Sequence, residues 1–360
     1  MNYQRAFLAD IAEHPADATP RRIYADWLEE HGQAERAELI RLQLQRAELP
    51  PDDLVGEELL VREQQLLAEH AAAWRATLPC YDGIEWGDFH GGFVEQVIAQ
   101  TPEAFLVQAE ALFQAAPIRR LRLRQQGKRG WGRRLGTDEV TRRLCELNLS
   151  NMRLNWVELS DLLHDGWCLE GLEELYLAYV KGFLSSDADG HFLASPHLHQ
   201  LHTLSVASMS LHRIVPLLMA EQSRTIRHLD MRDICLTGCY PPKGYRLGPT
   251  QLVVLQLSNC QLDGETLAAW LQEPNFELLR VLYLNHNPLG DEGIRSLTQQ
   301  PLRLLRDLDL RHCGLSSRGG EFLLESPLAE QLGRVWLGGN RFDRATWEAL
   351  RATFGQRLRG

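Results

Sequence analysis

Some polar side chains of this 360-residue chain have the types and spacing that catalysis or metal binding would need. Cys235 and Cys239 form the closest cysteine pair, but no second pair and no His-x-x-x-His follows to complete a zinc tetrahedron. His228 and Asp230 could form an acid–base pair, yet a repeating sheet brings unlike polar residues together whatever its function. A phosphate loop, a Gly-x-Ser-x-Gly turn and a His-Glu-x-x-His helix are missing. We therefore predict a non-enzyme without a cofactor or a metal.

A block of positive charge is the second group of candidate residues. The formal net charge of the chain is -10, yet residues 118–134 contain no carboxylate. Three of its arginines alternate, which places them on one side of a strand. The block comprises Arg120, Arg122, Arg124, Lys128, Arg129, Trp131, Arg133 and Arg134.

Like charges packed this closely repel one another, so something must offset them. The loop 127–136 is expected to present Trp131, and basic residues beside an aromatic ring can hold phosphates and stack a base, as nucleic-acid-binding proteins do. The acidic bulk of the chain would repel a long polyanion. We therefore favour an acidic segment of a partner protein, or internal pairing with Glu57, Glu58 or Glu63.

A repeated frame must position these residues. The pattern Leu-x-x-Leu-x-Leu-x-x-(Asn, Cys or other)-x-Leu returns eight times, at steps of 25 to 29 residues, and resembles a leucine-rich repeat. Its copies begin at Leu144, Leu172, Leu201, Ile226, Leu252, Leu279, Leu305 and Leu332. The Leu-x-Leu pair has the period of a half-buried strand, and apolar residues at helical spacing follow it. Strands stack about 4.8 Å apart whereas helices need about 10 Å, so the array must curve with its strands inside. The sequence predicts an α/β solenoid, a horseshoe with parallel concave strands and convex helices.

One strand and one full helix per repeat resembles the ribonuclease-inhibitor type of leucine-rich repeat. The nine residues 285–293, Asn-His-Asn-Pro-Leu-Gly-Asp-Glu-Gly, are similar to that family because a strand-ending Asn precedes the entry into a helix. This resemblance covers residues 118–356. It implies the fold and little about function, since members of the family bind many unrelated partners.

The N-terminus carries a second resemblance. Residues 24–30, Tyr-Ala-Asp-Trp-Leu-Glu-Glu, and 36–43, Arg-Ala-Glu-Leu-Ile-Arg-Leu-Gln, resemble the bacterial repeat-companion domain, found beside repeats in planctomycetes and myxobacteria. The usual ending has Gly and Phe where Ala37 and Leu39 stand here. The resemblance implies a small helical module and a bacterial lineage. It carries over no catalytic residue.

We predict three parts in the chain. Residues 1–80 form a small all-α domain, and residues 81–117 form a capping unit with a strand over 93–98 and a helix over 102–115. The solenoid takes up 118–360. Its C-terminal strand also needs cover, because an open strand edge pairs with other chains. The last helix is expected to fold over that edge.

The composition predicts a cytoplasmic protein. No run of about 18 apolar residues is present, and no charged-then-apolar leader begins the chain. The seven cysteines are odd in number and scattered, which suits a reducing compartment. A hydrophobic content of 44% excludes general disorder.

The frame also predicts which side chains face the concave surface. Positions three, five and seven of each copy point away from the core, because side chains alternate along a strand. Aromatic residues flanked by Arg and Asp are typical of interface hot spots, although some could merely cover the sheet. The predicted partner-binding residues are Tyr176, Tyr179, His228, Asp230, Arg232, Tyr283, Asp309, Arg311 and Trp336. Two insertions, 181–190 and 238–248, would add recognition material at the rim.

Together these patterns favour a protein–protein interaction module, a sensor, adaptor or regulatory subunit that holds another protein within a complex. No membrane and no small-molecule substrate is expected. The alternative is a nucleic-acid-binding accessory protein that uses residues 118–134. Recognition of nucleic acid would require this block to be exposed.

Overall fold

A computed structural model describes most of the chain. The described residues are 3–154, 156–181, 195, 197–209, 221–238, 249–271 and 276–359. Cys239 and all but the first residue of each expected insertion lie outside them.

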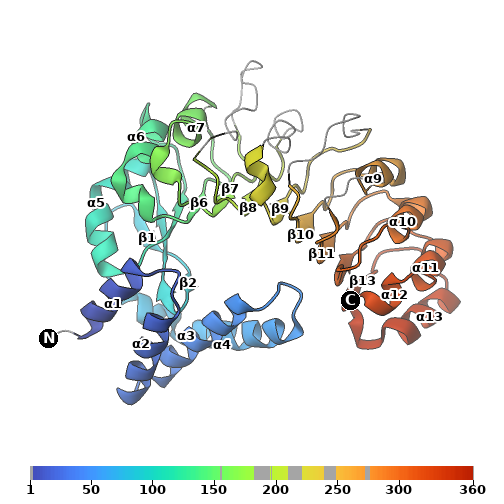
Figure 1. Ribbon diagram of the computed structural model, residues 1–360, viewed down its shortest axis with the longest axis horizontal. Helices are drawn as coiled ribbons and strands as arrows, with labels where there is room; N and C mark the ends of the chain where they lie inside the picture. Colours follow the sequence, from blue (N-terminus) through green and yellow to red (C-terminus); the bar gives the residue numbers. More distant parts are fainter. Residues whose placement is uncertain are drawn as a thin grey trace.

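The described residues form one curved sheet of twelve strands, with helices along its outer side (Figure 1). Its order is β1 (Ile84–Trp86), β4 (Gln96–Ala99), β5 (Arg120–Leu123), β6 (Glu146–Asn148), β7 (Glu174–Tyr176), β8 (Thr203–Ser205), β9 (His228–Asp230), β10 (Val254–Gln256), β11 (Val281–Tyr283), β12 (Asp307–Asp309), β13 (Arg334–Trp336) and β14 (Leu358–Arg359). Only β1 is antiparallel to its neighbour. Strands β6 to β13 occupy positions three to five of the eight frames, so the predicted horseshoe is confirmed.

The outer layer consists of short helices and turns of 3-10 helix. The helices are α5 (Pro102–Ala115), α6 (Trp131–Thr137), α7 (Trp156–Leu163), α9 (Gly264–Leu271), α10 (Gly290–Thr298), α11 (Ser317–Leu324), α12 (Leu328–Gln331) and α13 (Arg344–Phe354). The apolar core runs without a break between this layer and the sheet, from Val97 to Phe354. Each unit therefore buries its leucines against its neighbours.

Buried asparagines fix the turns that follow the strands. Asn287 is 1% exposed, and its Oδ1 accepts hydrogen bonds from the backbone N–H groups of Cys260 and Leu262 at 2.8 and 3.0 Å. Its Nδ2 donates to the carbonyls of Leu257 and Leu284 at 2.7 and 2.8 Å. One side chain thereby satisfies four backbone groups in two repeats, as buried polar groups require.

Cysteine replaces asparagine at this frame position in two copies. Cys260 and Cys313 are both fully buried, and their thiols donate to the carbonyls of Met231 and Leu284 at 3.1 and 3.2 Å. A thiol is only a weak donor, so it reproduces part of what the asparagine amide does. The small apolar group otherwise fills the space, as expected from the sequence.

The N-terminal helical region contains α1 (Tyr3–Glu13), α2 (Thr19–Glu30), α3 (Ala34–Glu48) and α4 (Leu54–Arg75). A hairpin of β2 (Phe89–His90) and β3 (Phe93–Val94) inserts into it, with Phe93 in the same cluster as Ile11 and Tyr24. The hairpin fits because Gly92 has φ +86° and a Cβ there would lie 2.0 Å from Ile40 Cγ1. The segments 1–80 and 81–117 therefore share a core, and their boundary stays a prediction.

Two expectations about the ends of the sheet need correction. The expected strand over 93–98 is interrupted at Glu95, whose carboxylate turns to a buried ion pair with Arg21 at 2.6 Å. At the other end, the edge of β13 is covered by the two-residue strand β14, not by α13, which joins the outer layer. Strand pairing satisfies the backbone groups of β13, which a helix lying over the edge could not do.

Candidate partner-binding surface

Strand register aligns the predicted concave residues in rows. Gln256, Tyr283 and Asp309 are direct neighbours on β10, β11 and β12, and Trp336 follows on β13. The same row includes Tyr176 on β7 and continues from it through β8 to β9. The frame thus placed these side chains on one surface.

A hollow of about 780 Å³ lies on this surface near its middle. Its lining comes from β10 to β12 and from the turns that follow β9 to β12. Four predicted residues line it: Arg232, Tyr283, Asp309 and Arg311. We call this feature the concave hollow. Asp230 adjoins it through Arg232. His228 begins the same strand, β9, and Tyr176 lies on β7, nearer the N-terminal end.

The charges at the concave hollow are arranged as two pairs along the strands. Arg232 binds Asp230 at 2.8 Å, and Arg311 binds Asp309 at 2.6 Å, each two residues apart on one strand face. These carboxylates raise the pKa of both guanidinium groups. The arginine side chains remain 45% and 41% exposed, so they can still meet a partner.

The other predicted aromatic and histidine residues are less open. The Tyr176 hydroxyl donates to Glu174 at 2.7 Å, and burial is the main reason why its pKa is raised. Burial likewise raises the pKa of Tyr283 and lowers that of His228. Each ring is therefore partly desolvated, which suits it to contact and makes ionisation at neutral pH unfavourable.

Sequence reasoning missed a row of turns just beyond the strands. In seven copies a non-glycine residue at frame position eight has φ between 54° and 67°, a left-handed conformation uncommon for such residues. They are Asn151, Tyr179, Ser208, Asp233, Asn259, His286 and His312. The eighth copy has Gly339 there, and a Cβ on it would come within 2.3 Å of the His312 ring. A signal was available, since Asn, Asp and His favour this conformation.

These turn residues link successive repeats along the rim of the concave hollow. The Tyr179 hydroxyl donates to Asp233, which also accepts from Asn259 Nδ2 at 2.7 Å. The rings of His286 and His312 stack with centroids 4.6 Å apart. Tyr179 is thus 38% exposed, as expected beyond its strand, but its hydroxyl is already bonded to the second repeat further along the chain.

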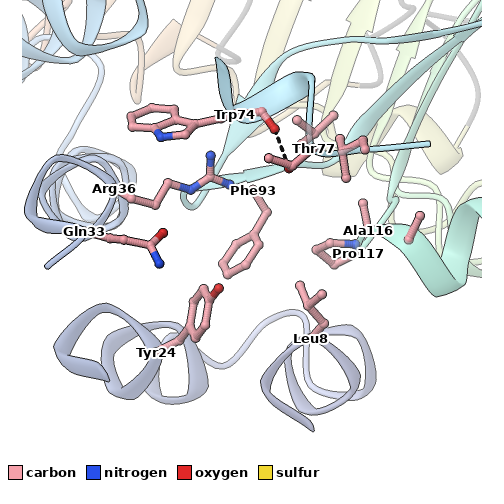
Figure 2. A pocket seen from close by; sticks show the side chains of 12 residues that line it. Leu8, Tyr24, Gln33, Arg36, Trp74, Thr77, Phe93, Ala116 and Pro117 are labelled. Atoms are coloured by element: carbon pink, nitrogen blue, oxygen red, sulfur yellow. Dashed lines mark hydrogen bonds between the residues drawn. The ribbon is translucent and has the colours of Figure 1, made fainter. Parts of the chain in front are cut away.

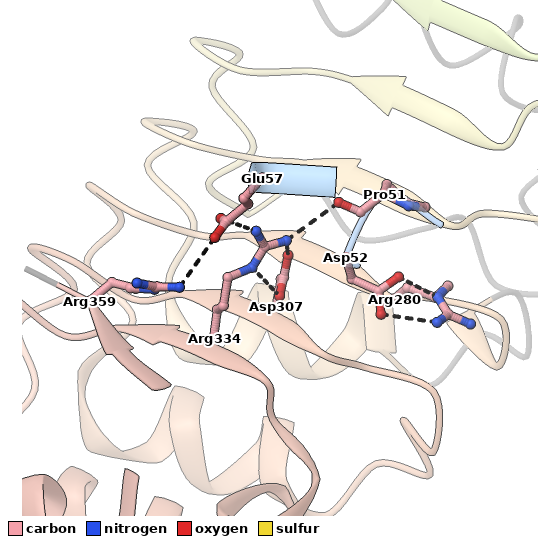
Figure 3. A network of polar contacts seen from close by, with 7 residues as sticks. All are labelled: Pro51, Asp52, Glu57, Arg280, Asp307, Arg334 and Arg359. Atoms are coloured by element: carbon pink, nitrogen blue, oxygen red, sulfur yellow. Dashed lines mark hydrogen bonds and ion pairs between the residues drawn. The ribbon is translucent and has the colours of Figure 1, made fainter. Parts of the chain in front are cut away.

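The C-terminal end of the concave surface is occupied by the chain itself. Helices α3 and α4 run across the inside of the arc (Figure 1), and the turn between them meets β11 to β14 (Figure 3). Arg334 binds both Asp307 and Glu57, and its Nη2 donates to the Pro51 carbonyl at 3.4 Å. We call residues 49–57 the helical tip. Trp336 lies in this occupied region, with Arg334 5.9 Å from its ring.

The basic block does not form one exposed site. Trp131, expected on a loop, is 1% exposed, because residues 131–137 form the helix α6 and its ring joins the core. Arg120 and Arg122 alternate on β5 with the buried Leu121 and Leu123 and so face the concave side, whereas Arg133 lies on the helix α6 of the outer layer. The block is therefore split between two faces of the sheet.

Carboxylates of the repeats and the capping unit offset part of this charge. Arg124 binds Glu85 and Arg134 binds Glu103, both at 2.6 Å. Arg120 binds Glu146 and Glu174. No ion pair with a described residue is formed by Arg122, Lys128, Arg129 or Arg133.

The expected internal partners of the block were the wrong carboxylates. Glu57 binds Arg334 and Arg359 instead, and Glu63 binds Arg46 at 2.8 Å. The chain folds the basic strand away from α4, so these groups never meet. Neighbouring repeats supply the carboxylates because strand pairing brings Glu146 beside Arg120.

The Leucine Rich repeat family matches residues 277–297 and 302–324, two of the repeats whose strands and buried asparagine are described above. These two segments are leucine-rich repeats, and the sheet of parallel strands has the leucine-rich-repeat fold. A chain in the crystal structure of the yeast Rad7 and Elc1 complex is similar, with a TM-score of 0.46 and 20% identity; the match covers 70% of this leucine-rich-repeat protein and 64% of that chain. A leucine-rich-repeat protein of Leptospira interrogans gives 0.28 and 15%, with coverages of 68% and 49%. No curated protein matches in sequence.

Within the described residues, no group of three or more His, Cys, Asp or Glu side chains is arranged to hold a metal ion. None of the described helices has the length and apolar character that crossing a membrane requires. The repeats' concave hollow is thus the best-defined candidate among the predicted sites.

Proposed function

We propose that this leucine-rich-repeat protein is a non-catalytic module that holds a partner protein on its concave surface, as a sensor, adaptor or regulatory subunit. The observation that carries the proposal is the concave hollow, where Tyr283, Arg232 and Arg311 converge. Tyrosine and arginine in a partly desolvated hollow are the residues that dominate binding energy at protein interfaces.

The partner's position follows from what else lies on the sheet. The helical tip binds Arg334 on β13 and Arg280 before β11, so we propose that the partner engages the turns that follow β9 to β12 and the strand ends beside them. Asp230, Tyr179 and Asp309 then lie at the border of contact. Trp336 supports the C-terminal end of the surface. Tyr176 and His228 extend the surface toward the N-terminal end.

Nucleic acid is the less supported partner. Arg120, Arg124 and Arg134 are bound to carboxylates, and Trp131 has no exposed face on which a base could stack. The four remaining cations of the block lie on different faces. Binding of a random oligonucleotide at about 50 mM salt should therefore be absent, because phosphate contacts would otherwise be strongest at low salt.

We also infer that residues 1–80 are a bacterial repeat-companion module, that 81–117 cap the solenoid of 118–360, and that the protein works in the cytoplasm. The four helices α1 to α4 support the first assignment. Affinity capture from the native cell extract tests the main proposal. The wild-type protein should retain a partner that the Tyr283→Ala variant loses; equal capture by both would reject the concave hollow.

A further inference from the structure

A pocket of about 330 Å³ lies where the N-terminal helices meet the first repeats, away from the concave hollow (Figure 2). Helices α1 to α4, strand β3 and the segment before β5 all contribute to its walls. Its apolar wall includes Leu8, Phe93 and Pro117, and Gln33 and Arg36 bring polar groups to it. The lining contains no acidic residue.

Arg36 is held in this pocket by aromatic rings. The centre of its guanidinium lies 4.8 Å from the Trp74 ring centroid, 4.9 Å from that of Phe89 and 5.9 Å from that of Phe93. Figure 2 shows the group between Trp74 and Phe93, with the Gln33 amide and the Tyr24 hydroxyl directed toward the same space. Contacts of this kind stabilise a cation without neutralising its charge.

Arg36 differs from the other arginines of α2, α3 and α4. Each of those has a carboxylate within 4.0 Å: Arg21 with Glu95, Arg22 with Glu48, Arg41 with Asp26 and Glu29, Arg46 with Glu63, Arg62 with Glu38 and Arg75 with Asp88. Within the described part of the chain, Arg36 forms no ion pair and no side-chain hydrogen bond. Among the arginines of these three helices, Arg36 is therefore the one that lines a pocket instead of pairing with a carboxylate.

Burial makes the charge of Arg36 costly. Removal from water lowers its pKa to about 10, and Tyr24 acts in the opposite direction. An anion entering the pocket would offset this cost, because a guanidinium offers two parallel N–H donors to a carboxylate. The pocket thus combines an unsatisfied cation with an apolar wall.

We propose that this pocket binds a monocarboxylate carried on an apolar group, with the carboxylate on Arg36 and the apolar group against Phe93, Leu8 and Pro117. A single guanidinium balances one negative charge, which favours a carboxylate over a doubly charged phosphate. The Gln33 amide can donate one further hydrogen bond. Such a carboxylate can belong to a free acid or to the C-terminus of a peptide chain. This proposal does not depend on the concave hollow.

Calorimetric titration of the full-length protein with 3-phenylpropanoate and with its neutral amide tests the proposal without any mutation. The acid should bind and the amide should bind at least about tenfold more weakly, since only the acid forms a charge-assisted pair. Absence of binding by the acid, or equal affinity for acid and amide, would overturn the proposal. N-acetyl-Leu-Phe, with a free or an amidated C-terminus, then separates the two sources of carboxylate. If the free peptide acid binds more tightly than its amide and than 3-phenylpropanoate, the ligand is the C-terminus of a peptide chain; otherwise it is a free acid.

Two matched variants locate the site. Arg36→Met keeps an apolar stem against Trp74 and Phe89 but removes the charge. The affinity for 3-phenylpropanoate should therefore fall by about tenfold or more. Arg41→Met removes a charge from the exposed side of the same helix and should leave the affinity unchanged. Equal affinities of the acid for wild type and for a folded Arg36→Met variant would contradict the assignment. Thermal melting of both variants shows whether they are folded, and the acid–amide comparison stands even if Arg36→Met is not.

Discussion

The carboxylate of Asp52 accepts two hydrogen bonds from the guanidinium of Arg280, a residue 228 positions later in the chain. The N···O distances are 2.6 and 3.0 Å, and the Asp52 side chain is 6% exposed. Asp52 belongs to the helical tip and Arg280 immediately precedes β11. This contact ties the N-terminal helices to the C-terminal repeats across the concave side of the horseshoe. We call this connection the brace.

Removing the acidic groups of the helical tip should release this brace. We expect the double variant Asp52→Ala, Glu57→Ala to lose about 1–3 kcal/mol of stability. Arg280 loses its two-point partner, and Arg359 loses its ion pair with Glu57. Backbone amides of residues 49–57 should then exchange hydrogen faster. The neighbouring Glu58→Ala, at an exposed position without an ion pair among the described residues, is the control. Unchanged exchange in the double variant would show that the tip is held by other contacts.

The buried Asn287 should carry a large share of local stability. Asn287→Ala leaves two carbonyls and two backbone N–H groups of adjacent repeats without partners, so we expect a loss of about 3 kcal/mol or more. Urea denaturation measures it. Thr237→Ala, at an exposed position whose hydroxyl donates one bond to the Gln261 carbonyl, should cost only about 1 kcal/mol. Similar losses of stability in the two variants would show that the four hydrogen bonds of Asn287 do not stabilise the repeats as described.

His90 should make the protein sensitive to mild acid. Burial, aided by Arg120, Arg46 and Arg21, lowers its pKa to about 3 in the folded chain. The unfolded chain binds a proton there below about pH 6.5, so stability is lost as the pH falls from 6.5 toward 3. Between pH 7 and pH 5 the loss due to His90 should be about 2 kcal/mol. Urea denaturation at both pH values should show a smaller loss for His90→Gln, and an identical loss would refute this origin.

The short strand β14 should protect the last repeat from self-association. Removal of residues 356–360 uncovers the edge of β13, which pairs with Leu358 and Arg359. An exposed strand edge recruits other chains. Light scattering after size exclusion should therefore detect oligomers of the truncated protein. The control that lacks Gly360 alone should keep the oligomeric state of the full chain. A truncated chain that stays monomeric would argue that α13 is sufficient.

The strands and helices of the repeats could be predicted from the sequence because a local pattern of apolar residues, repeated at a regular interval, specifies each of them. The Leu-x-Leu pairs place Leu255, Leu282 and Leu308 in register, and the alternation of a strand then sets Gln256, Tyr283 and Asp309 on the other side. Cys260 stands at the frame position of Asn or Cys and is fully buried. These inferences need only local geometry and the frame.

The features that could not be predicted from the sequence arise from contacts between segments that lie far apart in the chain. The pairing of Asp52 with Arg280 requires the curvature of the whole arc, and the burial of Trp131 depends on where α6 begins. Charge patterning indicated that the arginines near Arg120 needed partners, but it could not select Glu146 over Glu57. The pocket of Arg36 is formed by six separated segments and has no motif of its own.

The affinity of the captured partner for three variants tests the central claim most directly. Tyr283→Ala and Arg311→Ala alter the concave hollow, and Arg344→Ala alters an exposed arginine on α13 in the outer layer. Calorimetric titration with the purified partner should show losses of about 2 kcal/mol for each of the first two variants and less than about 0.5 kcal/mol for the third, with all three equally folded. Wild-type affinity in both variants of the concave hollow would contradict the account and move the partner to another surface.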